Sequence, residues 1–264
     1  MVDGADLWHR RPDGRAPTIV VMRQPAIHVE HVHKRYRGVV AVEDVSFQVE
    51  AGEVFGILGA NGAGKTTTVE LIAGLRRPDR GRIRVLGLDP RRDRAALRQV
   101  LGVQLQQSHL HHALTVAELV GLYRSFYPDP RPAAALLDLV ELSGHARTRF
   151  EKLSGGQQQR LSIALALAGR PRVVILDELT TGLDPRARLR VWAGVEELRD
   201  ETVLLVSHSM EEVERLCDRV ALFDRGRIVA VDTPAELVVR AGAATLVEAF
   251  VALTGRELTP EEDA

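Results

Sequence analysis

The chain has 264 residues, 45% of them hydrophobic, which is enough for one large α/β domain or for a core with a smaller subdomain. Its 35 basic and 36 acidic side chains leave a net charge of −1, which excludes a strong overall attraction to nucleic acid or to an anionic membrane surface. The single cysteine, Cys217, excludes an internal disulfide and a metal site made of cysteines alone.

The N-terminal part divides into a tail and a strand-rich segment. Residues 1–25 are rich in Arg, Pro, Gly and Asp without periodicity, which predicts a loose tail, and Met22 is a candidate for the true start. Residues 26–33 and 39–49 alternate between apolar and polar side chains, which is typical of antiparallel strands. Tyr36 is expected in the loop that connects them.

The next feature is a glycine-rich loop between a predicted strand and a predicted helix. Residues 54–58 have a buried-strand pattern, and residues 67–75 have a helical pattern. Residues 59–66, Gly-Ala-Asn-Gly-Ala-Gly-Lys-Thr, match G-x-x-x-x-G-K-[ST] at every fixed position. Such a loop points backbone N–H groups at a polyphosphate beside a helix N-terminus. We therefore expect Lys65 to reach the β- and γ-phosphates of ATP and the Thr66 hydroxyl to bind Mg²⁺.

The middle of the chain predicts two further strands and then a helical insertion. Residues 82–87 and 100–105 resemble strands that extend the sheet. Residues 116–127 and 133–142 show helical spacing with prolines between them, so residues 108–150 are predicted to be all helical. With the next helix, 155–168, which Ser154 caps, the helical subdomain is expected to span about residues 108–168.

The C-terminal half alternates between strands and helices, which favours a parallel sheet flanked by helices. The expected order is strand 173–176, helix 185–199, strand 203–206, helix 210–217 and a hairpin over 220–231. Thr233 and Thr245 each begin a capping-box pattern, and residues 255–264 predict a second loose tail.

Asp177 and Glu178 follow the buried strand 173–176, at the edge of the sheet where ligands bind in open α/β folds. Two acids at a strand end are commonly the start of a solvated loop, but the phosphate loop upstream favours a functional pair. We expect Asp177 to hold Mg²⁺, directly or through water. We expect Glu178 to orient and deprotonate the water that attacks the γ-phosphate.

The stretch Leu153-Ser154-Gly155-Gly156-Gln157 is a second glycine-rich helix start and hence a second candidate anion site. One nucleotide does not need two phosphate sites in one chain, so this site is expected to face a γ-phosphate held by another subunit.

With both motifs present, the chain resembles the ATP-binding subunits of ABC transporters, in which LSGGQ is the signature motif and ATP is sandwiched between two subunits arranged head to tail. The resemblance covers about residues 26–254. It implies a P-loop NTPase of ABC type: an α/β fold with a mainly parallel sheet core, an N-terminal antiparallel β subdomain and an inserted α-helical subdomain. It also implies an ATPase coupled to transmembrane transport.

The resemblance assigns roles to further residues by position. Tyr36 resembles the aromatic that stacks on adenine, Asp184 the loop aspartate that signals across the dimer, and His208 the histidine that senses the γ-phosphate. Gln106 resembles the glutamine that links Mg²⁺ to the helical subdomain, with Gln104 and Gln107 as alternatives. The complete expected set of nucleotide-contacting residues is Tyr36, Asn61, Gly62, Gly64, Lys65, Thr66, Thr67, Ser154, Gly156, Gln157 and Asp184, with Glu178, His208 and Gln106 catalytic and Thr66, Gln106 and Asp177 at Mg²⁺.

One position departs from the family pattern. Leu179 stands where proline usually follows the catalytic glutamate. This change removes no catalytic group, but it loosens the constraint on the backbone behind Glu178.

The resemblance also implies partners. They are ATP, a second ATP-binding subunit in a head-to-tail homodimer, and a separately encoded membrane permease at the cytoplasmic face of a bacterial membrane. No apolar run approaches about 18 residues, so we expect the polypeptide itself neither to cross nor to enter the bilayer.

The expected cargo class rests on three short stretches. Residues 182–185, 233–236 and 250–256 are similar to bacterial ABC-2 exporters of drugs and antibiotics, which favours export of such compounds. Two alternatives stay open: an ABC ATPase that acts on ribosomes or DNA, and an import-type subunit. A nucleic-acid partner is not expected from the near-neutral charge. The histidines at 109, 111 and 112 are better explained as permease contacts or surface than as metal ligands.

Overall fold

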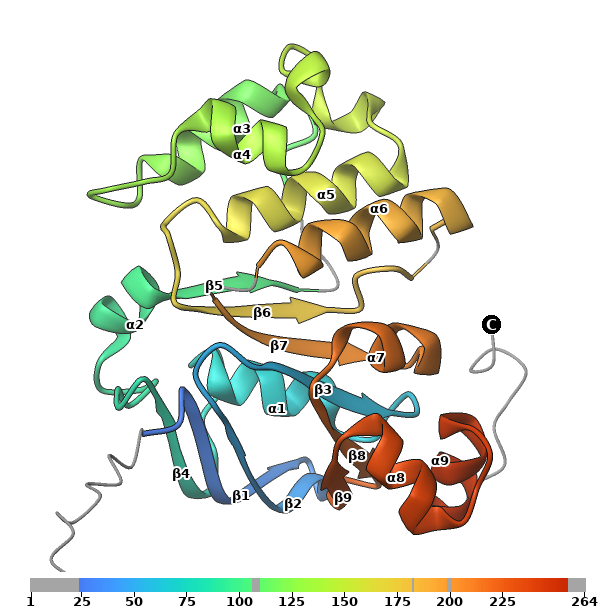
Figure 1. The fold of residues 1–264 in the computed structure, drawn as a ribbon. Helices are drawn as coiled ribbons and strands as arrows, with labels where there is room; N and C mark the ends of the chain where they lie inside the picture. Colours follow the sequence, from blue (N-terminus) through green and yellow to red (C-terminus); the bar gives the residue numbers. More distant parts are fainter. Residues whose placement is uncertain (1–23, 106–109, 182, 199–200, 256–264) are drawn as a thin grey trace, which may run out of the picture.

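The computed structural model describes residues 24–105, 110–181, 183–198 and 201–255, and all structural statements below concern these ranges (Figure 1). Almost all of the two predicted tails therefore lies outside the described residues, as does Gln106. The predicted limits of the ATPase domain, 26–254, and of the helical subdomain, about 108–168, remain predictions.

A three-stranded antiparallel sheet forms first, in the order β2-β1-β4. Its strands are β1 (Ile27–Tyr36), β2 (Val39–Val49) and β4 (Arg80–Val85). Arg37 and Gly38 join β1 to β2 in a two-residue turn, both with positive φ (43° and 94°), as the twist of a tight hairpin requires. Tyr36 is therefore the last residue of β1, and its predicted place in a loop is wrong because the turn is only two residues long.

The second sheet has six strands in the order β5-β6-β7-β3-β8-β9. The neighbours from β5 to β8 are parallel, and β9 closes a hairpin with β8. The strands are β3 (Val54–Gly59), β5 (Leu101–Gln104), β6 (Val173–Asp177), β7 (Thr202–Ser207), β8 (Arg219–Asp224) and β9 (Arg227–Asp232). Because β3, β6 and β7 run in the same direction, the residues that follow them meet at one edge.

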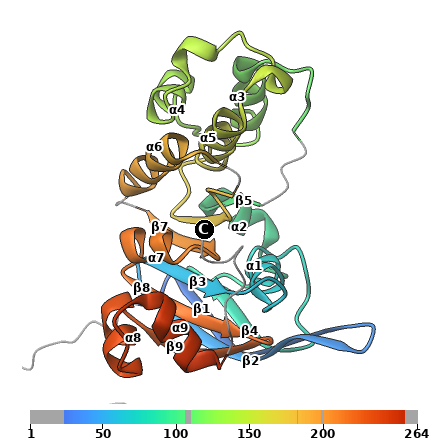
Figure 2. The same cartoon turned by 90° about the vertical axis from the view of Figure 1, so that its right-hand side faces the viewer.

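The helices occupy both sides of this sheet (Figures 1 and 2). They are α1 (Lys65–Ile72), α2 (Arg94–Val100), α3 (Val116–Arg124), α4 (Ala133–Leu139), α5 (Gly155–Ala166), α6 (Pro185–Glu196), α7 (Met210–Leu216), α8 (Pro234–Ala241) and α9 (Leu246–Thr254), with 3₁₀ turns η1 (Ser143–His145) and η2 (Phe150–Lys152). The segment from α3 to α5 lies between β5 and β6 in the chain and forms the helical layer farthest from the antiparallel sheet.

Two buried clusters fill the space on opposite faces of the six-stranded sheet. Alternate residues of one strand serve different clusters: Leu204 and Val206 of β7 pack with α1 and the antiparallel sheet, whereas Val203 and Leu205 pack with α3 to α7. Strands buried on both faces have the continuous apolar sequences that parallel sheets require.

The predicted strand and helix order is confirmed, with differences at the element ends. Helix α2 was not predicted, because in its sequence only Leu97 is buried and no apolar stripe is visible. Helix α1 begins at Lys65, earlier than the predicted start. Within the described ranges, no single helix has the length and apolar character to cross a membrane, although α8 and α9 together, bent by 58°, meet the same test.

Candidate nucleotide-binding and catalytic site

The glycine-rich loop lies between buried strand β3 and helix α1, as the sequence predicts. Gly62 and Gly64 have φ of 80° and 101°, in the left-handed region. A Cβ on Gly64 would lie 2.4 Å from the Ala41 carbonyl oxygen, so both the conformation and the close approach of β2 require glycine there. The loop is therefore a backbone cradle held against the antiparallel sheet.

Lys65 is buried at the base of this cradle, with 4% of its surface exposed. Its Nζ donates to the carbonyl oxygens of Gly59 and Ala60 at 2.5 and 3.2 Å. These bonds hold the ammonium inside the loop, where a phosphate is the natural counter-charge. Asn61, Gly62 and Thr66 are exposed, and Thr67 is half-buried, so the cradle opens to solvent.

Tyr36 is half-buried at the end of β1, opposite Val39. The Lys34 Nζ lies 5.3 Å from the centre of its ring. Val39 is 69% exposed, so an apolar and an aromatic side chain lie together at the hairpin tip. This tip can offer a stacking surface to a planar base.

Asp177 ends β6 and is 1% exposed. Its backbone N–H donates to the Oε1 of Gln104 at 3.0 Å, and the Nε2 of Gln104 donates to the Leu105 carbonyl at 2.9 Å. The Gln104 amide oxygen thus joins β5 to β6, while its amide nitrogen bonds the next residue of its own segment. Gln106 lies outside the described residues, so the choice among Gln104, Gln106 and Gln107 stays a prediction.

Glu178 lies directly after β6 with φ of 50°, a strained conformation for a residue with a side chain. Its N–H donates to the Val206 carbonyl at 2.9 Å. The next residue, Leu179, is fully buried in the helical core. A buried leucine side chain thus occupies the position at which the family pattern has proline.

His208 lies beside Glu178, with 3.7 Å between the His208 Nδ1 and the Glu178 Oε1. Their side chains are 26% and 8% exposed. The His208 ring lowers the pKa of Glu178, and this outweighs burial, which raises it. The structure therefore brings these two predicted residues together and favours an ionised Glu178.

The signature motif begins α5 on a different part of the molecule. Ser154 Oγ accepts from the Gln157 N–H at 3.3 Å, and the Gln157 Oε1 accepts from the Ser154 N–H at 2.9 Å, which completes a capping box. A Cβ on Gly156 would lie 3.0 Å from the Cβ of Ala187 in α6. Ser154 and Gly155 themselves are exposed.

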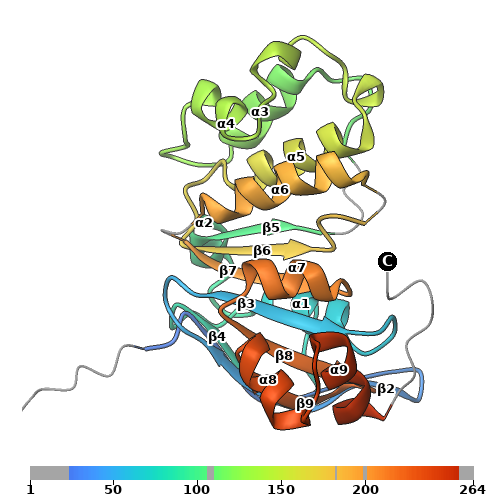
Figure 3. The same cartoon turned by 45° about the vertical axis from the view of Figure 1, so that its right-hand side comes forward.

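Asp184 caps α6 by accepting from the N–H groups of Arg186 and Ala187, both at 3.0 Å. Through the contact between Gly156 and Ala187, Asp184 and the signature motif belong to one surface of α5 and α6. Figures 1 and 3 show β6 and β7 between this surface and α1. The predicted site residues therefore form two groups: one around Lys65 and Glu178, the other around Ser154.

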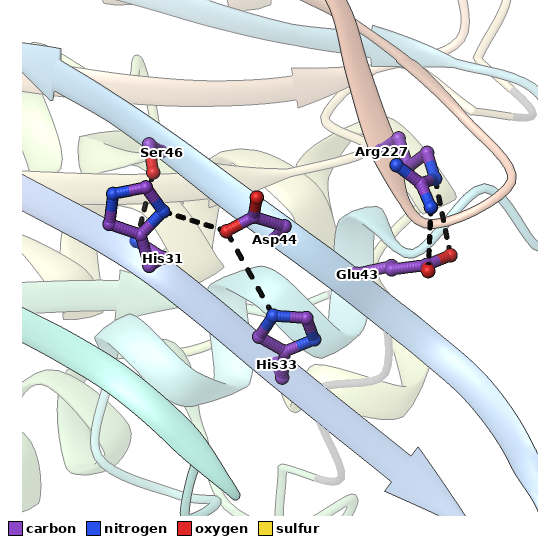
Figure 4. A network of polar contacts seen from close by, with 6 residues as sticks. All are labelled: His31, His33, Glu43, Asp44, Ser46 and Arg227. Carbon is purple, nitrogen blue, oxygen red and sulfur yellow. Dashed lines mark hydrogen bonds and ion pairs between the residues drawn. The ribbon is translucent and has the colours of Figure 1, made fainter.

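A further polar network, which the sequence did not indicate, fastens the antiparallel sheet (Figure 4). The Asp44 Oδ1 lies 2.8 Å from the His31 Nδ1 and 3.9 Å from the His33 Nε2. The Arg227 Nη2 of β9 pairs with the Glu43 Oε1 of β2 at 2.6 Å. The groups are largely exposed, so this network joins strands on the surface. Among the described residues, no group of three or more His, Cys, Asp or Glu is arranged to hold a metal ion.

A model of the ABC transporter family matches residues 42–181. The chain belongs to this family. It is an ABC ATPase, an enzyme that binds and hydrolyses ATP.

Known relatives of this ABC ATPase include two proteins with export or resistance names. It is 42% identical over 221 residues to the Nod factor export ATP-binding protein I of Rhizobium johnstonii, covering 81% of this chain and 71% of that protein. It is 36% identical over 232 residues to the linearmycin resistance ATP-binding protein LnrL of Bacillus subtilis, covering 85% and 75%.

Solved structures share the fold. An ATP-binding subunit of an ABC transporter superposes with a TM-score of 0.78 at 28% identity, covering 86% of this chain and 99% of that one. A dimeric ATP-binding cassette in a post-hydrolysis state with ADP and phosphate superposes at 0.72 and 25% identity, covering 78% and 98%. Cassettes of this family thus bind nucleotide and form dimers.

Proposed function

We propose that two copies of this ABC ATPase close head to tail around ATP and thereby drive a separate membrane permease. The observation that carries the proposal is the division of the site into two separate groups, one around Lys65 and one around Ser154, with β6 and β7 between them (Figure 1). A γ-phosphate in the cradle of one copy would face the signature motif of the other, in a symmetric pair with two such interfaces.

In this proposal each group of residues has one task. Lys65 and the loop N–H groups bind phosphate, and Tyr36 stacks on the base. Glu178 takes the proton of the attacking water, and His208 holds the Glu178 carboxylate and senses the γ-phosphate. From the second copy, Ser154, Gly156, Gln157 and Asp184 contact the same nucleotide, while Gln106 reports its presence to the helical subdomain.

We infer that Mg²⁺ accompanies the ATP. Asp177 and Thr66 would hold it, because a buried carboxylate at the strand end and an exposed hydroxyl on the first turn of α1 are oxygen donors of the kind Mg²⁺ prefers. When bound, the ion neutralises charge on the phosphates.

A groove supports contact with a permease. It has a volume of about 410 Å³ and lies between the end of α1, α2 and β5, with Leu75, Leu97, Arg98 and Leu105 among its lining residues. Leu75 is 57% exposed. Such an apolar floor with basic edges suits a short amphipathic segment of a membrane protein, and it would place this chain at the cytoplasmic face of a bacterial membrane.

The relatives favour export as the direction of transport. One is named for Nod factor export and another for linearmycin resistance, and both align over more than four-fifths of this chain. We propose that the cargo is a drug-like or antibiotic compound.

Trapping of the dimer tests the composite site. We expect the Glu178→Gln variant with MgATP to elute as a dimer in gel filtration, because ATP would close the interface and would not be hydrolysed. The double variant Lys65→Ala/Glu178→Gln is the control and should elute as a monomer. A Glu178→Gln protein that binds ATP and remains monomeric would contradict the proposal.

A further inference from the structure

The helix starts of this molecule use one sequence pattern in two different ways. In α3, α5, α8 and α9, a Ser or Thr at the helix start is followed three residues later by Glu or Gln. The side chain of this Glu or Gln accepts a hydrogen bond from a backbone N–H or a hydroxyl at the start of the same helix. The four residues at the later position are Glu118, Gln157, Glu236 and Glu248.

Helix α7 has the same pattern, Ser209-x-x-Glu212, and uses it differently. The Ser209 Oγ accepts from the Glu212 N–H at 3.4 Å, as in a cap, but the Glu212 carboxylate turns into the protein. Its Oε1 accepts from the Thr180 Oγ1 and from the Trp192 Nε1, both at 3.0 Å. Glu118, Glu236 and Glu248 are exposed, whereas Glu212 is 1% exposed.

The burial of this carboxylate is unfavourable unless something is gained from its position. The Glu212 Oε2 makes no hydrogen bond to any residue that the structure describes, so its partners are the two donors on Oε1. A glutamate that merely capped α7 would not need to leave water. Its burial therefore points to the groups it binds.

Those groups lead directly to the catalytic pair. Thr180 follows Glu178 by two residues, and α7, which carries Glu212, starts just after His208. The bond between Thr180 and Glu212 therefore ties together the two segments whose side chains meet at 3.7 Å. Thr180 is also the residue that follows Leu179, at which no proline ring restricts the backbone.

We propose that Glu212 is a positioning residue for ATP hydrolysis, which acts through the Thr180 hydroxyl to hold residues 178–180 in the conformation that directs Glu178 towards His208. The inference rests on the catalytic role of Glu178 proposed above. It assigns to a side-chain bond the restraint that proline gives elsewhere in the family.

The test uses Thr180, because valine has the shape of threonine without the hydroxyl. The full-length Thr180→Val, Thr180→Ser and Glu178→Gln variants are compared with the wild type in ATP hydrolysis, at concentrations where the rate per subunit has stopped rising. Thr233→Val is the matched control, since it removes the threonine hydroxyl that donates to Glu236 at 3.1 Å at the start of α8. Thermal unfolding of every variant is recorded.

We expect Thr180→Val to lower kcat about 10-fold with KM for ATP changed less than about 2-fold, because a displaced base affects the transition state more than substrate binding. Thr180→Ser should return kcat to near the wild-type value. Thr233→Val should lower the unfolding temperature and leave kcat unchanged.

Other outcomes overturn the inference. A wild-type kcat in Thr180→Val, a loss that serine does not restore, or an equal loss of kcat in Thr233→Val would each show that the bond is only structural. If Glu178→Gln itself hydrolyses ATP at the wild-type rate, the proposed catalytic role fails and the inference falls with it. An inactive Glu178→Gln beside a fully active Thr180→Val rejects the inference alone.

Discussion

Two glycine-rich helix starts, at α1 and at α5, differ in how much of their structure depends on the rest of the chain. At α1, Gly64 has φ of 101° and touches the Ala41 carbonyl, and the buried Lys65 ammonium bonds the loop from within. At α5, Ser154 and Gln157 complete their own cap, and Ser154 and Gly155 face solvent.

The difference shows which half of the site needs a partner. The α1 cradle is shaped by tertiary contacts and can bind a phosphate by itself. The α5 start is fully formed as a helix end but is turned outwards, so what it lacks is a ligand brought by another molecule. The predictions below test this division.

The largest effect is expected from Lys65→Ala, which removes the charge inside the cradle. ATP affinity should fall roughly 100-fold or more and hydrolysis should be lost with it, because the Lys65 ammonium is bonded inside the loop where it can neutralise phosphate charge. Titration with a fluorescent ATP analogue measures the affinity. Unchanged affinity would show that the backbone alone binds the phosphates.

Ser154→Arg should separate binding from hydrolysis. Because Ser154 is exposed and its group lies away from the cradle, ATP affinity of the single chain should stay within about 2-fold, whereas hydrolysis should fall about 50-fold as this chain's contact with the nucleotide of the other copy is lost. Because arginine caps the start of α5 less well than serine does, the unfolding of this variant is measured in parallel.

Mixing the two inactive variants sharpens the same comparison. A Lys65→Ala chain keeps its signature motif and a Ser154→Arg chain keeps its cradle, so a mixed dimer contains one intact site. An equal mixture should regain up to about a quarter of the wild-type rate, from the statistics of a two-fold symmetric pair. A mixture as inactive as its components would count against the shared site.

A change in pH dependence is expected from His208→Gln. The His208 ring makes the largest contribution that lowers the pKa of Glu178, so this pKa should rise without it. Glu178 must be ionised to take a proton, and the acid limb of the residual kcat profile should therefore move to higher pH. Rates measured from about pH 4 upwards test this, because the pKa of Glu178 in the wild type lies below the ordinary glutamate value, and an unmoved limb would show that His208 does not control Glu178 ionisation.

The smallest effects concern stability. Gly64→Ala should cost about 3 kcal/mol, since alanine is strained at φ of 101° and its Cβ would lie 2.4 Å from the Ala41 oxygen. Gly155→Ala should change stability by about 1 kcal/mol or less, in the stabilising direction, because nothing lies within 4 Å of that Cβ. Urea unfolding of both variants gives the comparison, and equal losses would refute it.

The sequence predicts those parts of the fold whose signal is local. The continuous apolar strands β3, β6 and β7, the phosphate loop, and the caps at Ser154, Thr233 and Thr245 all lie where their patterns place them. The residue pattern that reveals each of them lies within a few positions, so periodicity and cap chemistry are sufficient to locate them, although the strands pair with distant partners.

Features that depend on distant partners could not be predicted. The pairing of Gln104 with Asp177 and the strained φ of Glu178 exist only because β5, β6 and β7 are neighbours. Likewise, Ser209-x-x-Glu212 has the sequence of an ordinary cap, and only the position of Thr180 shows that its carboxylate is used elsewhere. Helix α2 has too little buried surface to leave a pattern.

Under the proposed stacking of the base on Tyr36, the approach of Gly64 to Ala41 has a consequence for which nucleotides fit. Ala41 lies on the strand that pairs with the one ending in Tyr36, and the Gly226 N–H donates to the Ala63 carbonyl at 2.9 Å, so the glycine-rich loop and the hairpin that carries Tyr36 are joined through main chain. The distance between the loop and the hairpin is thus fixed by backbone geometry. Exchanging side chains at the hairpin can alter which base is preferred, but it does not alter the length of nucleotide that fits between hairpin and loop.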